Sequence, residues 1–141
     1  MKYKTIGELA NFKINPKQVQ AYNTLLYNEQ CKYLLYGGAA HGGKSYFLRW
    51  SAVALGSYYF NKYKIKDIPI GLFSEDYPTL RDRQLIKIKR EFPEWLGVIK
   101  ESQIYGLAFI AKPKYGGWII MLRNLDDPSK YSSVEFAAIL V

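Results

Sequence analysis

The sequence predicts an α/β fold in which a mostly parallel sheet is flanked by helices. Three short segments, at residues 31–36, 68–73 and 136–141, are almost continuously apolar, as is typical of strands buried on both faces of a sheet. Segments with helical spacing of apolar residues precede or separate them, and this alternation favours an α/β architecture. With 141 residues, the chain suits about one domain.

The composition narrows the possible partners. Twenty basic residues against 12 acidic ones give a net charge of +8, which favours nucleic acid, nucleotide phosphates or an acidic membrane surface. The single cysteine, Cys31, excludes a disulfide framework and a four-cysteine zinc site, and it suits a reducing compartment. No apolar run approaches the roughly 18 residues of a membrane span, so we expect no membrane partner. Residues 1–12 also lack the apolar stretch of a secretory signal.

Local signals predict the first helix. Residues 1–14 have the composition of a loosely structured leader, and we place the domain at 15–141. Asn15 is a favoured cap and Pro16 a favoured first helical residue, and apolar residues follow at helical spacing. A helix is therefore predicted over 16–29.

A strand, a loop and a second helix are expected next. The apolar run at 31–36 predicts a buried strand, and residues 37–43 form a glycine-rich loop. Residues 44–60 contain no proline and carry their apolar residues on roughly one side. They therefore predict a helix that begins where the loop ends.

The middle of the chain predicts one more strand and one more helix. The strand covers residues 68–73, and the helix covers 79–92. Leucine, isoleucine and phenylalanine recur on one face of this helix, while arginines and lysines cover the other. Pro93 ends it, because proline cannot continue the hydrogen-bonding pattern of a helix.

The last third of the chain predicts a hairpin and a final strand. Residues 104–111 and 118–122 have strand character, and the glycine- and proline-containing segment 112–117 joins them as a turn. Asp126-Asp127-Pro128 predicts a further turn. The apolar run at 136–141 is the third buried strand.

The glycine-rich loop carries the most specific motif. Residues 38–45 fit G-x-x-x-x-G-K-[S/T], the Walker A pattern, with a predicted strand before it and a helix after it. Glycines let consecutive backbone N–H groups point at phosphate oxygens, and the helix adds its positive N-terminal end. The predicted nucleotide-binding residues are Gly38, Ala39, Ala40, His41, Gly42, Gly43, Lys44 and Ser45.

Two side chains of the motif have specific expected roles. Lys44 is expected to reach the β- and γ-phosphates as a catalytic residue, and the Ser45 hydroxyl to ligate Mg²⁺. For His41 two interpretations are open: a solvent-facing loop side chain, or a contact to the γ-phosphate or to a neighbouring subunit. The motif alone indicates a nucleoside triphosphate, and it does not say what work the triphosphate drives.

Several stretches together resemble one protein family. The segment NPKQ, followed by YLLYGGAAHGGKSYFLRW, is similar to the ATPase domain of the large terminase subunit of tailed bacteriophages, which often reads Tyr-Gly-Gly-Ala-Ala-x-Gly-Gly-Lys-Ser at this loop. DYPTLRD resembles the family's Tyr-Pro-x-Leu segment. The stretch GGWIIMLRNLDDPSKYSSVEFAAILV resembles the family's path from a small hairpin to the Walker B strand. The resemblance covers about residues 12–141.

This resemblance implies a fold and a function. The fold is a P-loop NTPase of the RecA-like (ASCE) class, and the function is that of a viral DNA-packaging motor. Such subunits form a homo-oligomeric ring at the portal of a procapsid and use ATP to drive double-stranded DNA inside. The portal protein and a small terminase subunit are the implied protein partners, and an RNase H-like nuclease domain usually follows. The implied location is the cytoplasm of the host bacterium, transiently at the procapsid portal.

The resemblance also implies a contact to the adenine base. Gln18, two residues after Pro16, matches the glutamine that precedes the family's first strand and tends to contact adenine. An amide can both donate to and accept from the adenine edge. Gln20 is the weaker alternative, and an exposed helical glutamine is the alternative to both.

One departure from the family concerns a catalytic arginine. Many relatives carry arginines just before the Tyr-Pro pair, where this chain has Ser74 and Glu75. If an arginine stabilises the transferring phosphate, the nearest candidates are Arg81 and Arg83. Both are also explained as solvated positions on a charged helix face.

A second departure concerns the Walker B acids. In the family, an Asp-Glu pair directly follows the Walker B strand, where it holds Mg²⁺ and polarises the attacking water. Here the sequence ends with the apolar run at 136–141, so this pair is not part of it. We therefore expect the ATPase domain to be incomplete at its C-terminal end, with nucleotide binding retained and hydrolysis weak. Asp126-Asp127 is more simply a turn, and Glu75-Asp76 follows a strand and could approach the site.

Other interpretations are kept beside the packaging motor. They are a helicase-like or other nucleic-acid-dependent P-loop ATPase, and a non-catalytic nucleotide-binding prophage remnant. Basic residues alternate with aromatic ones at 58–66, where DNA backbone contact or a packed helix end are both possible interpretations. The basic stripe at 81–90 allows the same two interpretations.

Overall fold

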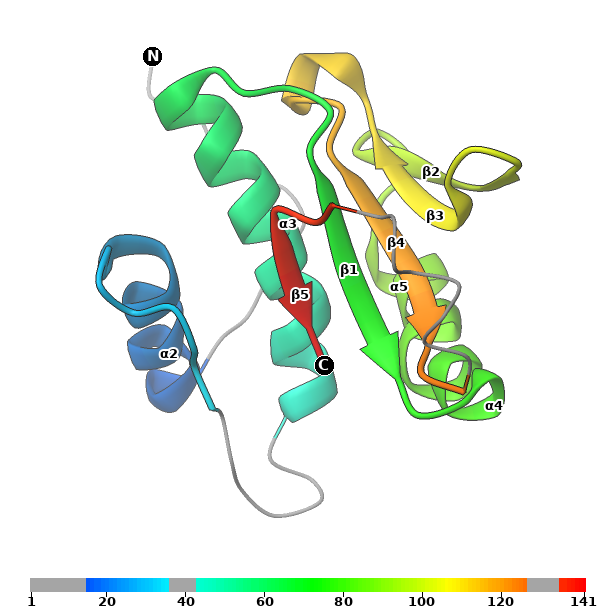
Figure 1. Cartoon of the computed structure of the whole chain (residues 1–141), viewed down its shortest axis with the longest axis horizontal. Helices are drawn as coiled ribbons and strands as arrows, with labels where there is room; N and C mark the ends of the chain where they lie inside the picture. Colours follow the sequence, from blue (N-terminus) through cyan, green and yellow to red (C-terminus); the bar gives the residue numbers. More distant parts are fainter. Residues whose placement is uncertain (1–14, 36–42, 127–134) are drawn as a thin grey trace.

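In the part of the chain that the structure describes, five strands form a central sheet with helices against it (Figure 1). The computed structural model describes residues 15–35, 43–126 and 135–141. Its strands follow the order β2-β3-β4-β1-β5. The α/β fold predicted from the sequence is therefore confirmed.

Three strands of the sheet are parallel. β1 (Pro69–Ser74) lies between β4 (Ile119–Asn124) and β5 (Ala138–Leu140) and pairs with both in parallel. Each of these strands overlaps an apolar segment that the sequence predicts as a strand. The carboxyl ends of β1 and β5 lie at the same edge of the sheet, which becomes important for the site.

The other two strands make the sheet mixed, so the predicted mostly parallel sheet is present only in part. β3 (Gly106–Ala111) runs antiparallel to both β4 and β2 (Gly97–Ser102). The short connections enforce this direction, because a parallel pair needs a crossover of a dozen or more residues. The predicted turn between β3 and β4 contains the 3₁₀-helix η2 (Pro113–Tyr115).

The predicted strand at 31–36 is wrong over the described residues 31–35, which pair with no strand of the described sheet. Tyr33 and Leu35 are each 94% exposed. A cavity of about 640 Å³ lies between this segment, α3 and β5. An apolar run becomes a strand only where another backbone supplies hydrogen bonds.

The first two described helices begin where the sequence predicts. α2 (Pro16–Tyr27) starts with Asn15 and Gln18 in a reciprocal capping box. α3 (Lys44–Tyr63) runs three residues beyond the predicted end and stops at Lys64, which adopts a left-handed conformation with φ of 59°. None of the helices in the described residues combines the length and the apolar character needed to cross a bilayer.

The predicted helix at 79–92 is present but is not uniform. It consists of α4 (Tyr77–Leu80), a π-helical turn η1 (Arg81–Leu85) and α5 (Ile86–Glu91). It begins two residues early because Asp76 caps it, accepting a hydrogen bond from the backbone N–H of Thr79 at 2.8 Å. π-Helical turns are rare and often occur at functional sites.

The two faces of the sheet are covered differently. Ile70, Leu72 and Ile120 are fully buried in the main core, which they share with α3, α4 and α5. The opposite face carries a smaller cluster around Ile119 and Met121, against which Phe136 packs. The helices described here thus lie mainly on one face.

α3 approaches the sheet closely at Gly56. The ring of Trp118, which has no exposed surface, occupies the space that a Cβ atom at this position would need. A glycine inside a helix is unfavourable by about 1 kcal/mol relative to alanine, so this close contact accounts for its presence. The contact fixes the height of α3 above the sheet.

Candidate functional site

A cleft of about 790 Å³ opens where the beginning of α3 meets the carboxyl ends of β1 and β5. In Figure 1 both strands point toward the end of the molecule at which α3 starts. In open α/β sheets, ligands bind in crevices outside the carboxyl ends of the strands. The polar and charged side chains lining this cleft are Lys44, Ser45, Arg49, Ser74, Glu75, Thr79, Asp82, Arg83, Gln84 and Lys87.

The N-terminal end of α3 supplies the feature that suits an anion. Lys44 and Ser45 form its first turn, and both line the cleft. The cap residue Gly43 has no side chain, so no side chain at that position accepts a hydrogen bond from the first N–H groups of the helix. The partial positive charge of a 20-residue helix is therefore directed into the cleft.

The backbone at Gly43 requires glycine for two reasons. Its φ of 76° lies in the left-handed region that other residues rarely adopt. A Cβ atom there would also lie 2.8 Å from the side-chain nitrogen of Gln18. This glycine thus turns the chain into α3 while Gln18 lies against it.

Gln18 is 3% exposed, and both ends of its amide are engaged. Its oxygen accepts from the backbone N–H of Asn15 at 3.0 Å, and its nitrogen donates to the Gly43 carbonyl at 3.3 Å. Gln18 therefore connects the cap of α2 with the residue that begins α3. Its predicted adenine contact stays a prediction, as does the weaker alternative at the exposed Gln20.

Five residues of the Walker A segment lie outside the described residues: Gly38, Ala39, Ala40, His41 and Gly42. The described part of the motif consists of Gly43, Lys44 and Ser45. These three residues lie together at the mouth of the cleft.

Two buried polar side chains join α3 to the π-helical turn. Gln84 is 2% exposed, and its amide nitrogen donates to the backbone carbonyl of Ser45 at 3.3 Å. Arg49 is 5% exposed, pairs with the Glu91 carboxylate at 2.5 Å and donates to the Arg83 carbonyl at 3.4 Å. The turn is thereby held against the first turns of α3.

This pair of contacts was missed at the sequence level, although a signal existed. Gln84 lies four residues after Leu80 and four before Ile88, both on the predicted inner face of the helix. A glutamine on an inner face needs hydrogen-bond partners, because burying an amide without them is unfavourable. Helical spacing could therefore have marked Gln84 as a polar contact of the core.

The structure separates the two candidate catalytic arginines. Arg83 lines the cleft, whereas Arg81 does not. The Arg81 guanidinium is half exposed and pairs with Asp82 at 3.0 Å. This hydrogen bond to the Asp82 carboxylate raises the pKa of Arg81 above its ordinary value. Of the two, Arg83 is placed to contact a bound anion.

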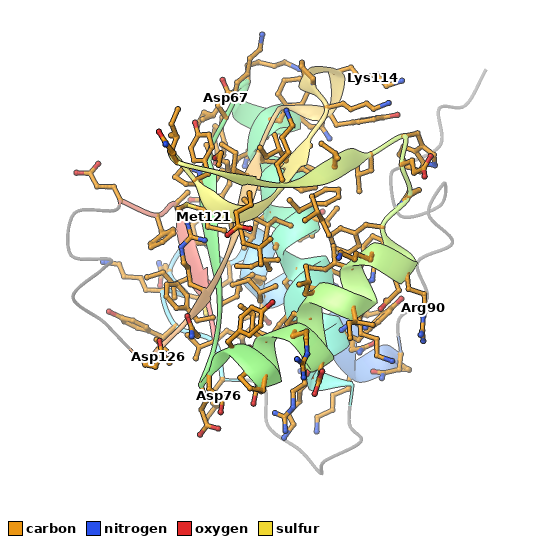
Figure 2. The ribbon with its side chains drawn as sticks, turned by 90° about the vertical axis from the view of Figure 1, so that its right-hand side faces the viewer. Asp67, Asp76, Arg90, Lys114, Met121 and Asp126 are labelled. Atoms are coloured by element: carbon orange, nitrogen blue, oxygen red, sulfur yellow. The ribbon has the colours of Figure 1, made fainter. Side chains whose placement is uncertain are left out.

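The acidic residues near the cleft also differ in position. Glu75 follows β1 and lines the cleft. Asp76 is used as the cap of α4, and the hydrogen bond from the Thr79 backbone lowers the pKa of its carboxyl group. Asp126 follows β4 at the same end of the molecule (Figure 2), and Asp127 lies outside the described residues.

No preformed metal cage is present in the part of the chain that the structure describes. There, no three histidine, cysteine or carboxylate residues gather closely enough to hold an ion. Side-chain oxygen atoms at the cleft come from the hydroxyls of Ser45, Ser74 and Thr79, the amide of Gln84 and the carboxylates of Glu75 and Asp82. Mg²⁺ usually keeps several waters and binds through few protein ligands together with substrate phosphates, so it does not require a preformed cage.

The chain was compared with known protein families, proteins and structures. A scan against family models, a search of curated proteins and a search of solved structures each returned no match. The assignment of a function therefore depends on the cleft itself and on the motifs in the sequence.

Proposed function

We propose that the cleft binds the triphosphate of ATP together with Mg²⁺. The observation that carries this proposal is the position of Lys44 and Ser45. They form the first turn of a long helix that is entered through a left-handed glycine, and they line a cleft at the carboxyl ends of two parallel strands. This is the chemical environment that the Walker A pattern requires.

Each residue has a defined role in this proposal. The Lys44 ammonium contacts the β- and γ-phosphates, and the backbone N–H groups at the start of α3 contact phosphate oxygens. The Ser45 hydroxyl ligates Mg²⁺, which withdraws charge from the phosphates when bound. Arg83 also lines the cleft, where a guanidinium can stabilise charge on the transferring phosphate.

We further propose that the chain is the ATP-binding part of a viral DNA-packaging motor. The support is the resemblance to large terminase subunits, which extends from the segment NPKQ to the final apolar run. In this proposal the partners are double-stranded DNA, a portal protein, a small terminase subunit and further copies of the subunit in a ring. Hydrolysis of ATP would drive DNA into a procapsid in the host cytoplasm.

Titration with a fluorescent ATP analogue, with and without MgCl₂, tests the binding site. Lys44→Ala should weaken binding by tenfold or more, in line with about 1.5–3 kcal/mol for a hydrogen bond to a charged group. Ser45→Ala should remove mainly the Mg²⁺-dependent part of the affinity. Lys100→Ala, on the exposed edge strand β2, is the matched control and should bind as the wild type does. Unchanged binding by Lys44→Ala would reject the proposed site.

A second experiment tests the motor. The protein in a form that includes the expected Walker B acids is combined with purified procapsids, linear duplex DNA and ATP, and DNA that becomes resistant to nuclease is measured. Packaging that is lost with Lys44→Ala supports the motor. Strand separation without packaging would instead identify a helicase-like ATPase. Nucleotide binding without either activity would identify a non-catalytic remnant.

A further inference from the structure

A cluster of lysines and tyrosines lies at the far end of α3 from the cleft. With a rise of 1.5 Å per residue, the 20 residues of α3 separate the two ends by about 30 Å. Segments 58–67 and 112–117 contain five lysines and one acidic residue, Asp67. The lysines are Lys62, Lys64, Lys66, Lys112 and Lys114, and all five are exposed.

The two segments form one surface, although about 50 residues separate them in sequence. The Asp67 backbone N–H donates to the Gly116 carbonyl at 2.9 Å. The ring of Phe60 fills the space beside Gly116 where a side chain would otherwise lie. Figure 2 shows Asp67 and Lys114 together at one end of the molecule, with Asp76 and Asp126 at the other. We call the surface formed by segments 58–67 and 112–117 the lysine–tyrosine surface.

The tyrosines of this surface hold one lysine in place. The Lys62 ammonium lies over the rings of Tyr58 and Tyr63, 5.4 and 5.2 Å from their centroids, and donates to the Tyr58 hydroxyl at 2.9 Å. The hydrogen bond to the Tyr58 side chain raises the pKa of Lys62 above its ordinary value. The positive charge is therefore positioned by its neighbours.

The ring geometry distinguishes between two ways of binding a polynucleotide: stacking of bases on the tyrosine rings, and contact with the phosphate backbone. Tyr58 meets Tyr63 edge to face, with centroids 6.2 Å apart, and meets Tyr27 in the same manner at 5.6 Å. Contacts with other rings and with the Lys62 ammonium cover part of these rings and so reduce the room for stacked bases. The ammonium groups and the tyrosine hydroxyls remain as hydrogen-bond donors for phosphate oxygens.

The surface suits nucleic acid better than a lipid bilayer. Membrane binding by an interfacial helix requires a broad apolar face beside the basic one. Within 61–67 the exposed aliphatic side chain is Ile65, and the remaining positions are polar, charged or tyrosine. Lysines spread along two segments match a repeating row of phosphates, for which direct base readout is not needed.

We propose that the lysine–tyrosine surface binds the phosphate backbone of duplex DNA without sequence preference. The proposal rests on the proposed function for the choice of duplex DNA, and it adds the surface that makes the contact. The contact does not involve the nucleotide cleft.

The test measures binding of a short labelled duplex by fluorescence anisotropy at increasing KCl concentrations. The triple variant Lys62→Gln, Lys64→Gln, Lys66→Gln is compared with Lys17→Gln, Lys32→Gln, Lys100→Gln, which removes the same charge from exposed positions outside both basic segments. Each lysine that contacts phosphate contributes about 1 to the slope of log K against log salt. The first variant should lose about 3 units of slope and tenfold or more in affinity, and the second should stay near the wild type.

Binding of both variants to phosphatidylserine vesicles is measured as well. Three outcomes would overturn the proposal: no duplex binding by the wild type, equal losses of duplex affinity in both triple variants, or a first variant that loses vesicle binding but keeps its duplex affinity. Thermal unfolding of both variants checks that they fold.

Tyr58→Phe provides a gentler test, because it removes only the hydroxyl that holds Lys62 and should still weaken duplex binding. ATP-analogue binding is measured in parallel. Duplex binding without ATP binding would reject the proposed function and leave this surface standing, and the reverse result would reject the surface alone.

Discussion

The side-chain amide of Gln18 donates to the backbone carbonyl of Gly43 at 3.3 Å, and so joins the start of α2 to the start of α3. The residues between them include the glycine-rich loop of the Walker A motif. The contact therefore holds Gly43, the last residue of that loop, through a side chain that belongs to α2. Gln18 has a structural role in this arrangement, whether or not it also contacts a base.

Replacing Gln18 by leucine should destabilise the fold. The backbone N–H of Asn15 and the Gly43 carbonyl would each lose a partner, which corresponds to about 1–3 kcal/mol. Urea unfolding measures the change. Gln20→Leu, at an exposed position of the same helix, should have little effect. Equal destabilisation by the two variants would show that the contact to Gly43 contributes nothing.

Gly56 and Ser57 should respond in opposite ways to substitution by alanine. Gly→Ala usually stabilises a helix, but at Gly56 the new Cβ would collide with Trp118, and overpacking destabilises by about 1–3 kcal/mol. The Ser57 hydroxyl is buried and makes no hydrogen bond within the described residues, so Ser57→Ala should be neutral or stabilising. Thermal unfolding of both variants checks the prediction. A stabilised Gly56→Ala variant would contradict the close contact.

The Arg49–Glu91 pair should show strong coupling in a double-mutant cycle. Both side chains lie mostly out of solvent, at 6% and 21% exposure, so removing one partner leaves a poorly solvated charge. Arg49→Met should therefore destabilise by about 3 kcal/mol. Adding Glu91→Gln should recover part of this loss, because the amide is neutral and its oxygen can still accept from Trp50. Simple additivity of the two changes would argue against the pair.

Asp76 should contribute stability that depends on pH. The hydrogen bond from the Thr79 backbone lowers its pKa in the folded state below the ordinary value of about 3.9 for aspartate. Its contribution is therefore fully present above that ordinary value and is lost as the pH falls through the lowered pKa. Asp76→Asn keeps a capping side chain without the titration. The stability difference between wild type and variant should shrink on acidification, and a difference that stays constant with pH would contradict the prediction.

Elements with strong local signals could be predicted from the sequence. Asn15-Pro16 marks the start of α2, and Pro93 the end of the helical region that finishes at Glu91. These signals act over three or four residues, so they do not depend on tertiary contacts. The first turn of α3 could likewise be placed, because the motif itself defines where the helix begins.

Elements that depend on distant partners were less predictable. Residues 31–35 have the composition of a strand, but they pair with no strand of the described sheet. β2 was missed because it is an edge strand whose side chains are mostly half or fully exposed, so its apolar pattern is weak. At the cleft, Gln84 contacts Ser45 and Arg49 contacts the Arg83 carbonyl. Both contacts depend on a π-helical turn that no local rule specifies.

The close contact between Gly56 and Trp118 divides α3 into two arms of unequal length. Twelve residues separate Gly56 from Lys44 and seven separate it from Tyr63, so the two arms are about 18 Å and 10 Å long. If α3 tilted about this contact, its two ends would move in opposite directions, and Lys44 would move farther than Tyr63. A larger side chain at position 56 would instead push the whole helix away from the sheet.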